Sequence, residues 1–173
     1  MKNKIAFLTA TWFGSGLIPP IIVNGMAGTY GSFFSIPLCY AALLAGKHIP
    51  LLYGGIMILI FLVGLWSVPK AETLLGPRTD WKGKTRTQDQ NQIVIDETLG
   101  MLVTCYPLLY FPAGSTLLRL LAAFILFRVF DIIKVPPTKV FDRMHDAFGV
   151  MFDDVIAGTY ASIILVLLLI IFQ

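Results

Sequence analysis

Residues 49–68 read "IPLLYGGIMILIFLVGLWSV", a stretch without a single charged side chain. A helix of about 20 apolar residues is long enough to cross the hydrocarbon core of a bilayer. Trp66 lies near the end of this stretch, where an indole ring anchors a helix at the membrane–water interface. The stretch therefore predicts a membrane-spanning helix and decides the class to which the whole chain belongs.

The composition agrees with a membrane protein. Hydrophobic residues make up 57% of the 173-residue chain and charged residues 13%, whereas soluble domains carry about 25% charge. A net charge of +3 is too small to predict nucleic-acid binding, and no RNA-binding motif accompanies it. Cys39 and Cys105 lie in separate apolar runs, so we expect two buried thiols rather than a disulfide or zinc site. We expect a single domain over residues 1–173.

Four further apolar runs are candidate spans, at 32–46, 93–111, 116–133 and 155–172. Pro37 lies near the start of the shortest run and suits a first helical turn. Residues 5–23 are apolar but are broken by Gly14, Gly16, Pro19 and Pro20, which predicts a re-entrant or interfacial segment. The predicted fold is all-α: a polytopic membrane helix bundle of about four to five transmembrane helices plus this broken N-terminal segment.

Basic residues predict how the bundle is oriented. Two loops carry most of them: Lys70, Arg78, Lys82, Lys84 and Arg86 in 69–92, and Lys134, Lys139 and Arg143 in 134–152. Cytoplasmic loops are enriched in Lys and Arg, so we expect both loops in the cytoplasm. Five spans then place the C-terminus on the outside.

Half of the ten acids fall in one window, residues 127–158. These are Asp131, Asp142, Asp146, Asp153 and Asp154. With Asp96 and Glu97 at the start of 93–111, the expected topology brings acids from three helix ends to the same membrane face. An acid at the centre of a membrane helix costs roughly 2.5–3.5 kcal/mol, so we expect these acids to face the bundle interior.

Carboxylates that converge repel one another unless a cation lies between them. Oxygen ligands without cysteine suit Mg²⁺. The candidate ligands are Asp96, Glu97, Asp131, Asp153 and Asp154. The alternative is that acids near helix N-termini are favoured one at a time by the helix dipole, although this does not account for Asp131 near a helix C-terminus.

A Mg²⁺ ion held by these acids, with Arg128 and Lys134 close by in sequence, suits phosphate-ester chemistry. Arg128 and Asp131 are three residues apart and share a helix face, and Lys134 follows. Gly100 and Gly158 each follow an acid by four residues, which leaves room for close helix approach.

A second candidate site lies near the N-terminus, in the glycine-rich stretches "FGSGLIPP" (13–20) and "GMAGTYGS" (25–32). Turns of this kind that open onto a helix start can cradle a phosphate through backbone N–H groups. The candidate phosphate-binding residues are Gly14, Ser15, Gly28, Thr29 and Ser32, together with Arg128 and Lys134. No P-loop spacing is present, and glycine also serves helix packing in membranes.

Other chemistries have weaker support. "IVIDETL" (93–99) resembles the aspartyl-phosphatase motif, but Thr98 stands where the second Asp is required. His145 beside Asp146 could act as a general base, although such a histidine is more often a solvated loop residue. Cys105 lies mid-span without a nearby histidine or polar setting, which disfavours it as a nucleophile.

The order "FGSG", "GTYGS", "IVIDETLG", "FRVFDIIK" and "GVMFDDVIAG" closely resembles the phosphatidylglycerophosphatase A family, from about Phe13 to Ala161. The resemblance implies Mg²⁺-dependent hydrolysis of phosphatidylglycerophosphate to phosphatidylglycerol and phosphate at the bacterial inner membrane. It also implies family acidic positions at the five candidate ligands, basic positions at Arg128 and Lys134, and a "GTxGS" segment at residues 28–32. This chain departs from the family at Ala27, where proline is usual, and at Ala147–Phe148, where a glycine pair is usual.

We therefore expect a phosphatase that acts on a membrane phospholipid. The expected catalytic residues are Asp96, Glu97, Asp131, Asp154, Arg128 and Lys134. A metal-activated water or a carboxylate-activated water could attack the phosphoryl group, and a covalent phosphoenzyme stays open. The rival functions are a CDP-alcohol phosphotransferase, whose DGxxAR core is missing, an ion-coupled transporter and a structural membrane subunit. The sequence carries no signal for the oligomeric state.

Overall fold

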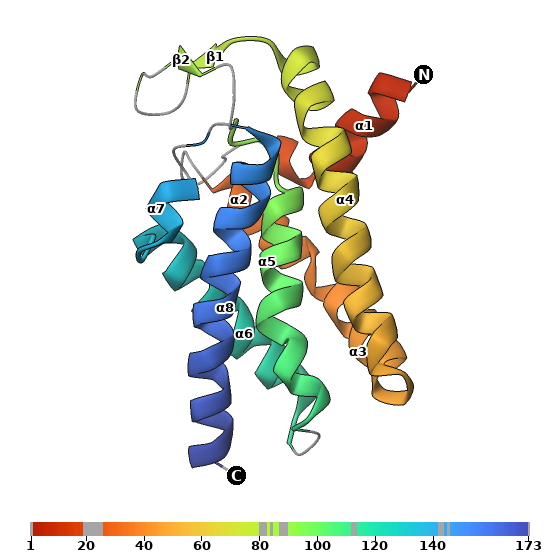
Figure 1. Ribbon diagram of the computed structural model, residues 1–173, viewed down its shortest axis with the longest axis vertical. Helices are drawn as coiled ribbons and strands as arrows, with labels where there is room; N and C mark the ends of the chain where they lie inside the picture. Colours follow the sequence, from red (N-terminus) through yellow and green to blue (C-terminus); the bar gives the residue numbers. More distant parts are fainter. Residues whose placement is uncertain are drawn as a thin grey trace.

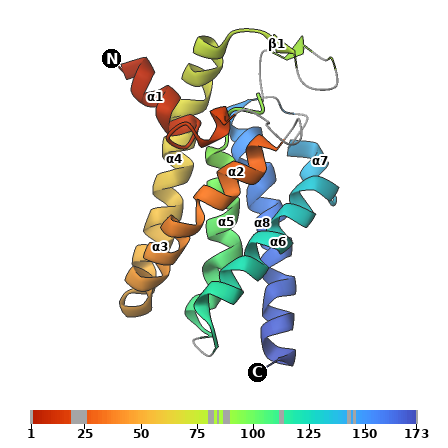
Figure 2. The same cartoon turned by 180° about the vertical axis from the view of Figure 1, so that it is seen from behind.

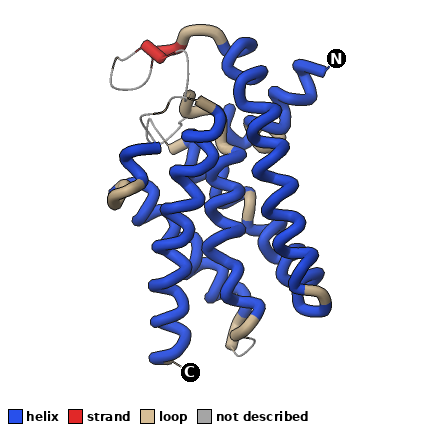
Figure 3. Tube along the Cα trace, in the orientation of Figure 1, coloured by secondary structure: helices blue, strands red, loops and turns tan. Residues whose placement is uncertain are grey.

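The computed structural model describes residues 2–18, 26–79, 83, 85–86, 90–111, 114–141, 144 and 146–172, without the side chains of Arg78, Arg86 and Lys139. Some residues named above lie outside this part of the chain: Pro19, Pro20, Lys82, Lys84, Asp142, Arg143 and His145. The described residues are helical except for loops and one antiparallel pair of two-residue strands, β1 (Arg78–Thr79) and β2 (Thr85–Arg86) (Figure 3). The predicted all-α membrane helix bundle is confirmed.

In chain order the helices are α1 (Lys2–Ala10), η1 (Ser15–Leu17), α2 (Ala27–Phe34), α3 (Ile36–His48), α4 (Pro50–Leu75), α5 (Ile95–Cys105), η2 (Tyr106–Leu109), α6 (Thr116–Ile133), α7 (Thr138–Phe141) and α8 (Ala147–Ile171). Helices α2 and α3 run in the same direction, and α4, α5, α6 and α8 then alternate in direction (Figure 1). The N-terminus, the β1–β2 hairpin and α7 lie toward one end of the bundle, and the α3–α4 connection and the C-terminus lie at the other. The two basic loops therefore share an end, which we call the basic end.

Among the described residues, three stretches are long and apolar enough to cross a membrane: Ala27–His48, which joins α2 and α3, then Pro50–Leu75 and Ala147–Ile171. Helix α5 has only 11 residues before η2, and α6 carries three charged residues within its 18. The count of four to five spans therefore stays a prediction. Helix α1, with nine residues, is about 14 Å long and too short to cross; it packs beside α4 (Figure 2).

Several helix boundaries differ from the hydropathy pattern, most of all at the end of α4 and at the start of α8. Helix α4 continues through Pro69 to Leu75, past the predicted end at 68. Helix α8 begins at Ala147 rather than at 155, because the Asp146 side chain caps it by accepting the Gly149 N–H at 2.6 Å. Pro37 lies in the first turn of α3, as predicted.

The interior is built where α3, α5, α6 and α8 meet. Cys39 and Cys105 are buried free thiols in this core, as expected. The buried Tyr53 hydroxyl donates to the Leu102 carbonyl at 2.8 Å, which ties α4 to α5. A second core cluster, which includes Ile95, packs the first turn of α5 against α8, and that contact positions the acids.

Candidate active site

Three of the predicted metal ligands come together between α5 and α8. Asp96 and Glu97 lie in the first turn of α5, and Asp154 lies on α8. Each offers a carboxylate oxygen, and these oxygens lie within 4.8 Å of one another. We call these three residues the acid triad.

The acid triad is poorly solvated. Asp154 is buried, with 4% of its surface exposed. Asp96 Oδ1 and Glu97 Oε2 are buried oxygens with no hydrogen-bond partner among the described residues. Buried charges without a partner are costly, and like charges at this separation repel. The arrangement therefore fits a cation with oxygen ligands, and Mg²⁺ matches this donor set.

Two glycines let the helices that carry the acid triad approach each other. A Cβ at Gly158 on α8 would lie 2.5 Å from the Gly100 carbonyl oxygen on α5. A Cβ at Gly100 would lie 3.0 Å from the Asp154 carbonyl oxygen and would overlap the Phe127 ring. The role predicted for these glycines from their spacing is confirmed, because a larger residue at either position would push α5 and α8 apart.

The position at which α8 begins tests the alternative that the helix dipole alone accounts for the acids near helix N-termini. Asp153 and Asp154 lie about two turns beyond the Asp146 N-cap. The dipole effect falls off within the first turn. It can account for Asp96 and Glu97 in the first turn of α5, but it gives no reason for the two acids on α8.

The other two predicted ligands pair with cations. Arg128 Nη1 lies 2.8 Å from Asp131 Oδ2, which confirms the shared helix face. Lys134 Nζ lies 3.2 Å from Asp153 Oδ2, which links the end of α6 to α8. The structure therefore separates the five acids into the acid triad and two ion pairs.

Helix α2 lies beside Glu97 of the acid triad. The segment expected as a glycine-rich turn is helical from Ala27, so Gly28, Thr29 and Ser32 lie inside α2. A Cβ at Gly28 would overlap Glu97 Oε1 and would lie 3.1 Å and 3.2 Å from the terminal nitrogens of Arg128. Arg128 Nη1 also donates to Ser32 Oγ at 3.3 Å. The first turn of α2, whose N–H groups have no partner within the helix, therefore lies beside Glu97 and Arg128.

Gly14 and Ser15, the other phosphate-binding candidates, lie at η1. They line a cavity of about 340 Å³ with Trp12, Phe13, Ile18 and Phe34, and none of these lining residues is a predicted metal ligand. The structure places these two residues in a different setting from Gly28 and Ser32.

The sequence reasoning missed a polar contact that holds α2 on α5. The hydroxyls of Ser35 and Thr98 lie 2.6 Å apart and are buried. Ser35 also lies 2.7 Å from the Gly31 carbonyl, to which it donates, so Thr98 can donate to Ser35. Thr98 directly follows Glu97, and this bond therefore fixes α2 beside the acid triad. No sequence signal pairs two hydroxyls that lie so far apart in the chain.

Comparison with known proteins then decides the family. The family described as Phosphatidylglycerophosphatase A matches residues 8–169. The chain belongs to the phosphatidylglycerophosphatase A family. It is 36% identical over 159 residues to the Haemophilus influenzae protein named Phosphatidylglycerophosphatase A, covering 91% of this chain and 84% of the relative. It is 31% identical over 159 residues to the Escherichia coli protein of the same name, covering 91% and 80%.

Another relative carries a different substrate in its name. The chain is 30% identical over 161 residues to a Bacteroides thetaiotaomicron protein provisionally named a phosphatidylinositol-3-phosphatase, covering 91% of this chain and 89% of the relative. No solved structure matches the chain. Membership of the phosphatidylglycerophosphatase A family confirms the resemblance and the prediction of an enzyme of the phosphatase class. It favours a phosphatase over the transferase, transporter and structural alternatives.

Proposed function

We propose that this member of the phosphatidylglycerophosphatase A family hydrolyses phosphatidylglycerophosphate to phosphatidylglycerol and phosphate, with Mg²⁺ held by the acid triad. The observation that carries the proposal is the set of buried carboxylate oxygens without hydrogen-bond partners, Asp96 Oδ1 and Glu97 Oε2, beside Asp154. A Mg²⁺ ion held there would act as a Lewis acid and would polarise a phosphoryl oxygen.

Cations and backbone donors beside the acid triad would hold the substrate phosphate. Arg128 Nε is buried with no partner among the described residues, and a guanidinium presents five N–H donors in a fixed plane. Together with Lys134 and the first-turn N–H groups of α2, Arg128 would donate to the non-bridging oxygens of the phosphate. Donors that are fixed in advance stabilise the charge that develops in the transition state.

Asp131 and Asp153 have a separate part in this proposal. Asp131 forms an ion pair with Arg128 at 2.8 Å, and Asp153 forms one with Lys134 at 3.2 Å. We assign them to orienting these cations toward the phosphate rather than to holding the metal. The acid triad then carries three negative charges, which suits a hard divalent ion.

The basic end of the bundle supports the proposal that the active site faces the cytoplasm, in a protein of the bacterial inner membrane. Both basic loops lie at this end, and the acid triad lies in the half of the bundle nearer to it (Figure 1). Lysine and arginine favour the cytoplasmic side. A phospholipid head group can reach the site from this face while its acyl chains stay in the bilayer.

The test is phosphate release by the purified protein in detergent, from phosphatidylglycerophosphate and from phosphatidylinositol 3-phosphate in parallel. We expect faster release from phosphatidylglycerophosphate, loss of release with EDTA and recovery on addition of Mg²⁺. Release that is unchanged by EDTA would contradict the metal proposal. A preference for the inositol lipid would contradict the proposed substrate.

Two matched substitutions on α8 separate the site from the helix. Asp154→Asn removes one charge from the acid triad, and we expect it to abolish release. Asp146→Asn removes one charge from the exposed N-cap of the same helix. Because asparagine caps as well as aspartate, this control should keep the activity of the unchanged protein.

A further inference from the structure

Apolar side chains that are partly buried or exposed form a stripe along α6, beginning beside Arg128. Phe124 lies one turn before Arg128 on this helix, and Leu121 and Leu117 continue in steps of three and four residues. Residues at these steps share one helix face. Leu121 is 37% exposed and Leu117 is 63% exposed. The stripe runs from Arg128 away from the basic end.

A second stripe runs along α2 and α3. Phe33 directly follows Ser32 and is 52% exposed. Tyr40 and Leu44 are 45% and 52% exposed, and their spacing of 7 and 11 residues from Phe33 places them on the same helical face. The backbone of Ser35 between α2 and α3 is itself in the right-handed helical region, so the two helices carry this face with little interruption.

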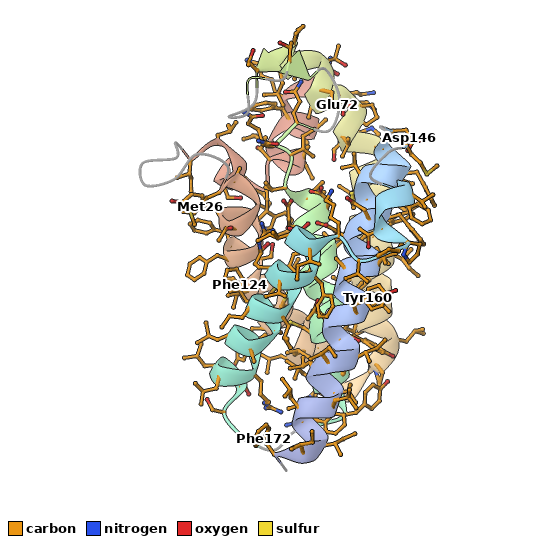
Figure 4. The ribbon with its side chains drawn as sticks, turned by 90° about the vertical axis from the view of Figure 1, so that its left-hand side faces the viewer. Met26, Glu72, Phe124, Asp146, Tyr160 and Phe172 are labelled. Atoms are coloured by element: carbon orange, nitrogen blue, oxygen red, sulfur yellow. The ribbon has the colours of Figure 1, made fainter. Side chains whose placement is uncertain are left out.

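The two stripes meet at their ends nearer to the basic end of the bundle. The rings of Phe33 and Phe124 pack edge to face, with centroids 6.2 Å apart. Arg128 reaches Ser32 at 3.3 Å. Figure 2 shows α2–α3 and α6 on the same face of the bundle with α5 behind them, and Figure 4 shows Phe124 on α6 where this helix passes α2.

We infer that this α2–α6 face binds an acyl chain of the lipid whose phosphate lies at Arg128. The inference rests on the proposed function. A phospholipid joins a charged head group to apolar chains, and the face presents the same order: a guanidinium and a hydroxyl, then two aromatic rings, then exposed aliphatic side chains. The contact would favour a phosphate carried on a lipid over the same phosphate ester in water, because only the lipid buries apolar surface on this face.

The test compares two substrates that share the phosphate ester. One is long-chain phosphatidylglycerophosphate in mixed micelles, and the other is its deacylated, water-soluble head group. The variants are Phe33→Ala and Leu121→Ala on the face. The matched control is Leu62→Ala on α4, a leucine that is 56% exposed elsewhere on the bundle.

For Phe33→Ala and Leu121→Ala we expect KM for the lipid to rise about fivefold, the loss of apolar contact from one half-exposed side chain. We expect kcat, and kcat/KM for the deacylated head group, to stay unchanged, and Leu62→Ala to behave as the unchanged protein. Equal losses on both substrates would overturn the inference, because the residues would then act on the site itself. The inference would also be overturned if KM for the lipid were the same in Phe33→Ala, Leu121→Ala and Leu62→Ala, since the face would then be ordinary lipid-exposed surface. If the unchanged protein releases phosphate from neither substrate, the proposed function fails first.

Discussion

Gly28→Ala tests whether the first turn of α2 and the acid triad form one site. The added Cβ would overlap Glu97 Oε1 and would press on both terminal nitrogens of Arg128, at 3.1 Å and 3.2 Å. The Glu97 carboxylate is the end of a flexible side chain. It can therefore move away from the added Cβ, by about 1 Å, to reach an ordinary van der Waals distance. A displacement of about 1 Å in a catalytic group can lower the rate about 100-fold.

The same substitution should leave the fold intact. Alanine is favoured over glycine in helices by up to about 1 kcal/mol, so the unfolding temperature in detergent should not fall. Gly54→Ala on α4 is the matched control, because a Cβ there meets nothing within 4 Å. We expect phosphate release to drop about 100-fold in Gly28→Ala and to be unchanged in Gly54→Ala. Full activity in Gly28→Ala would refute the placement of Glu97 and Arg128 against α2.

Two further predictions concern the packing that positions the acid triad. Thr98→Val removes the buried hydrogen bond to Ser35 and should lower the free energy of unfolding, measured by denaturation, by about 1–2 kcal/mol. Thr159→Val is the control, because it breaks only an exposed hydrogen bond within α8, and it should have a smaller effect in the same assay. Gly158→Ala forces a Cβ to 2.5 Å from the Gly100 carbonyl and should cost about 1–3 kcal/mol. Gly55→Ala, with open space around it, should cost nothing, and equal unfolding curves for the two glycine variants would contradict the close α5–α8 contact.

Patterns local in the chain predicted much of the site. The apolar runs and the basic loops predicted helices whose acid-bearing parts lie toward one end of the bundle, and spacing within one helix predicted the Arg128–Asp131 pair. The four-residue spacing of Gly158 from Asp154 likewise predicted close helix approach beside the acid, and the structure shows that the neighbouring helix is α5. The first prediction depends on hydropathy and on the basic residues of the loops, and the other two depend on residue spacing within a single helix; a sequence displays all of these directly.

Features that depend on contacts between distant segments were not predictable. The Lys134–Asp153 pair joins α6 to α8, and it divides the five acids into the acid triad and two ion pairs. Hydropathy also placed the start of the last helix too late, because the polar and acidic first turns of α8 are stabilised by the Asp146 cap rather than by lipid. The glycines of "GTYGS" suggested a turn, but they serve close packing of α2 on Glu97 and Val94 instead.

The central claim is that Asp96, Glu97 and Asp154 hold a divalent cation. The most direct measurement is binding of Mn²⁺, a paramagnetic stand-in for Mg²⁺, to the purified protein by electron paramagnetic resonance, with Asp154→Asn and Asp146→Asn alongside. The account predicts that Mg²⁺ displaces Mn²⁺ from the unchanged protein and from Asp146→Asn. It also predicts that Asp154→Asn binds Mn²⁺ at least tenfold more weakly, because loss of even an outer-shell partner of a metal costs about 10- to 100-fold in affinity. Equal binding by Asp154→Asn and the unchanged protein would contradict it.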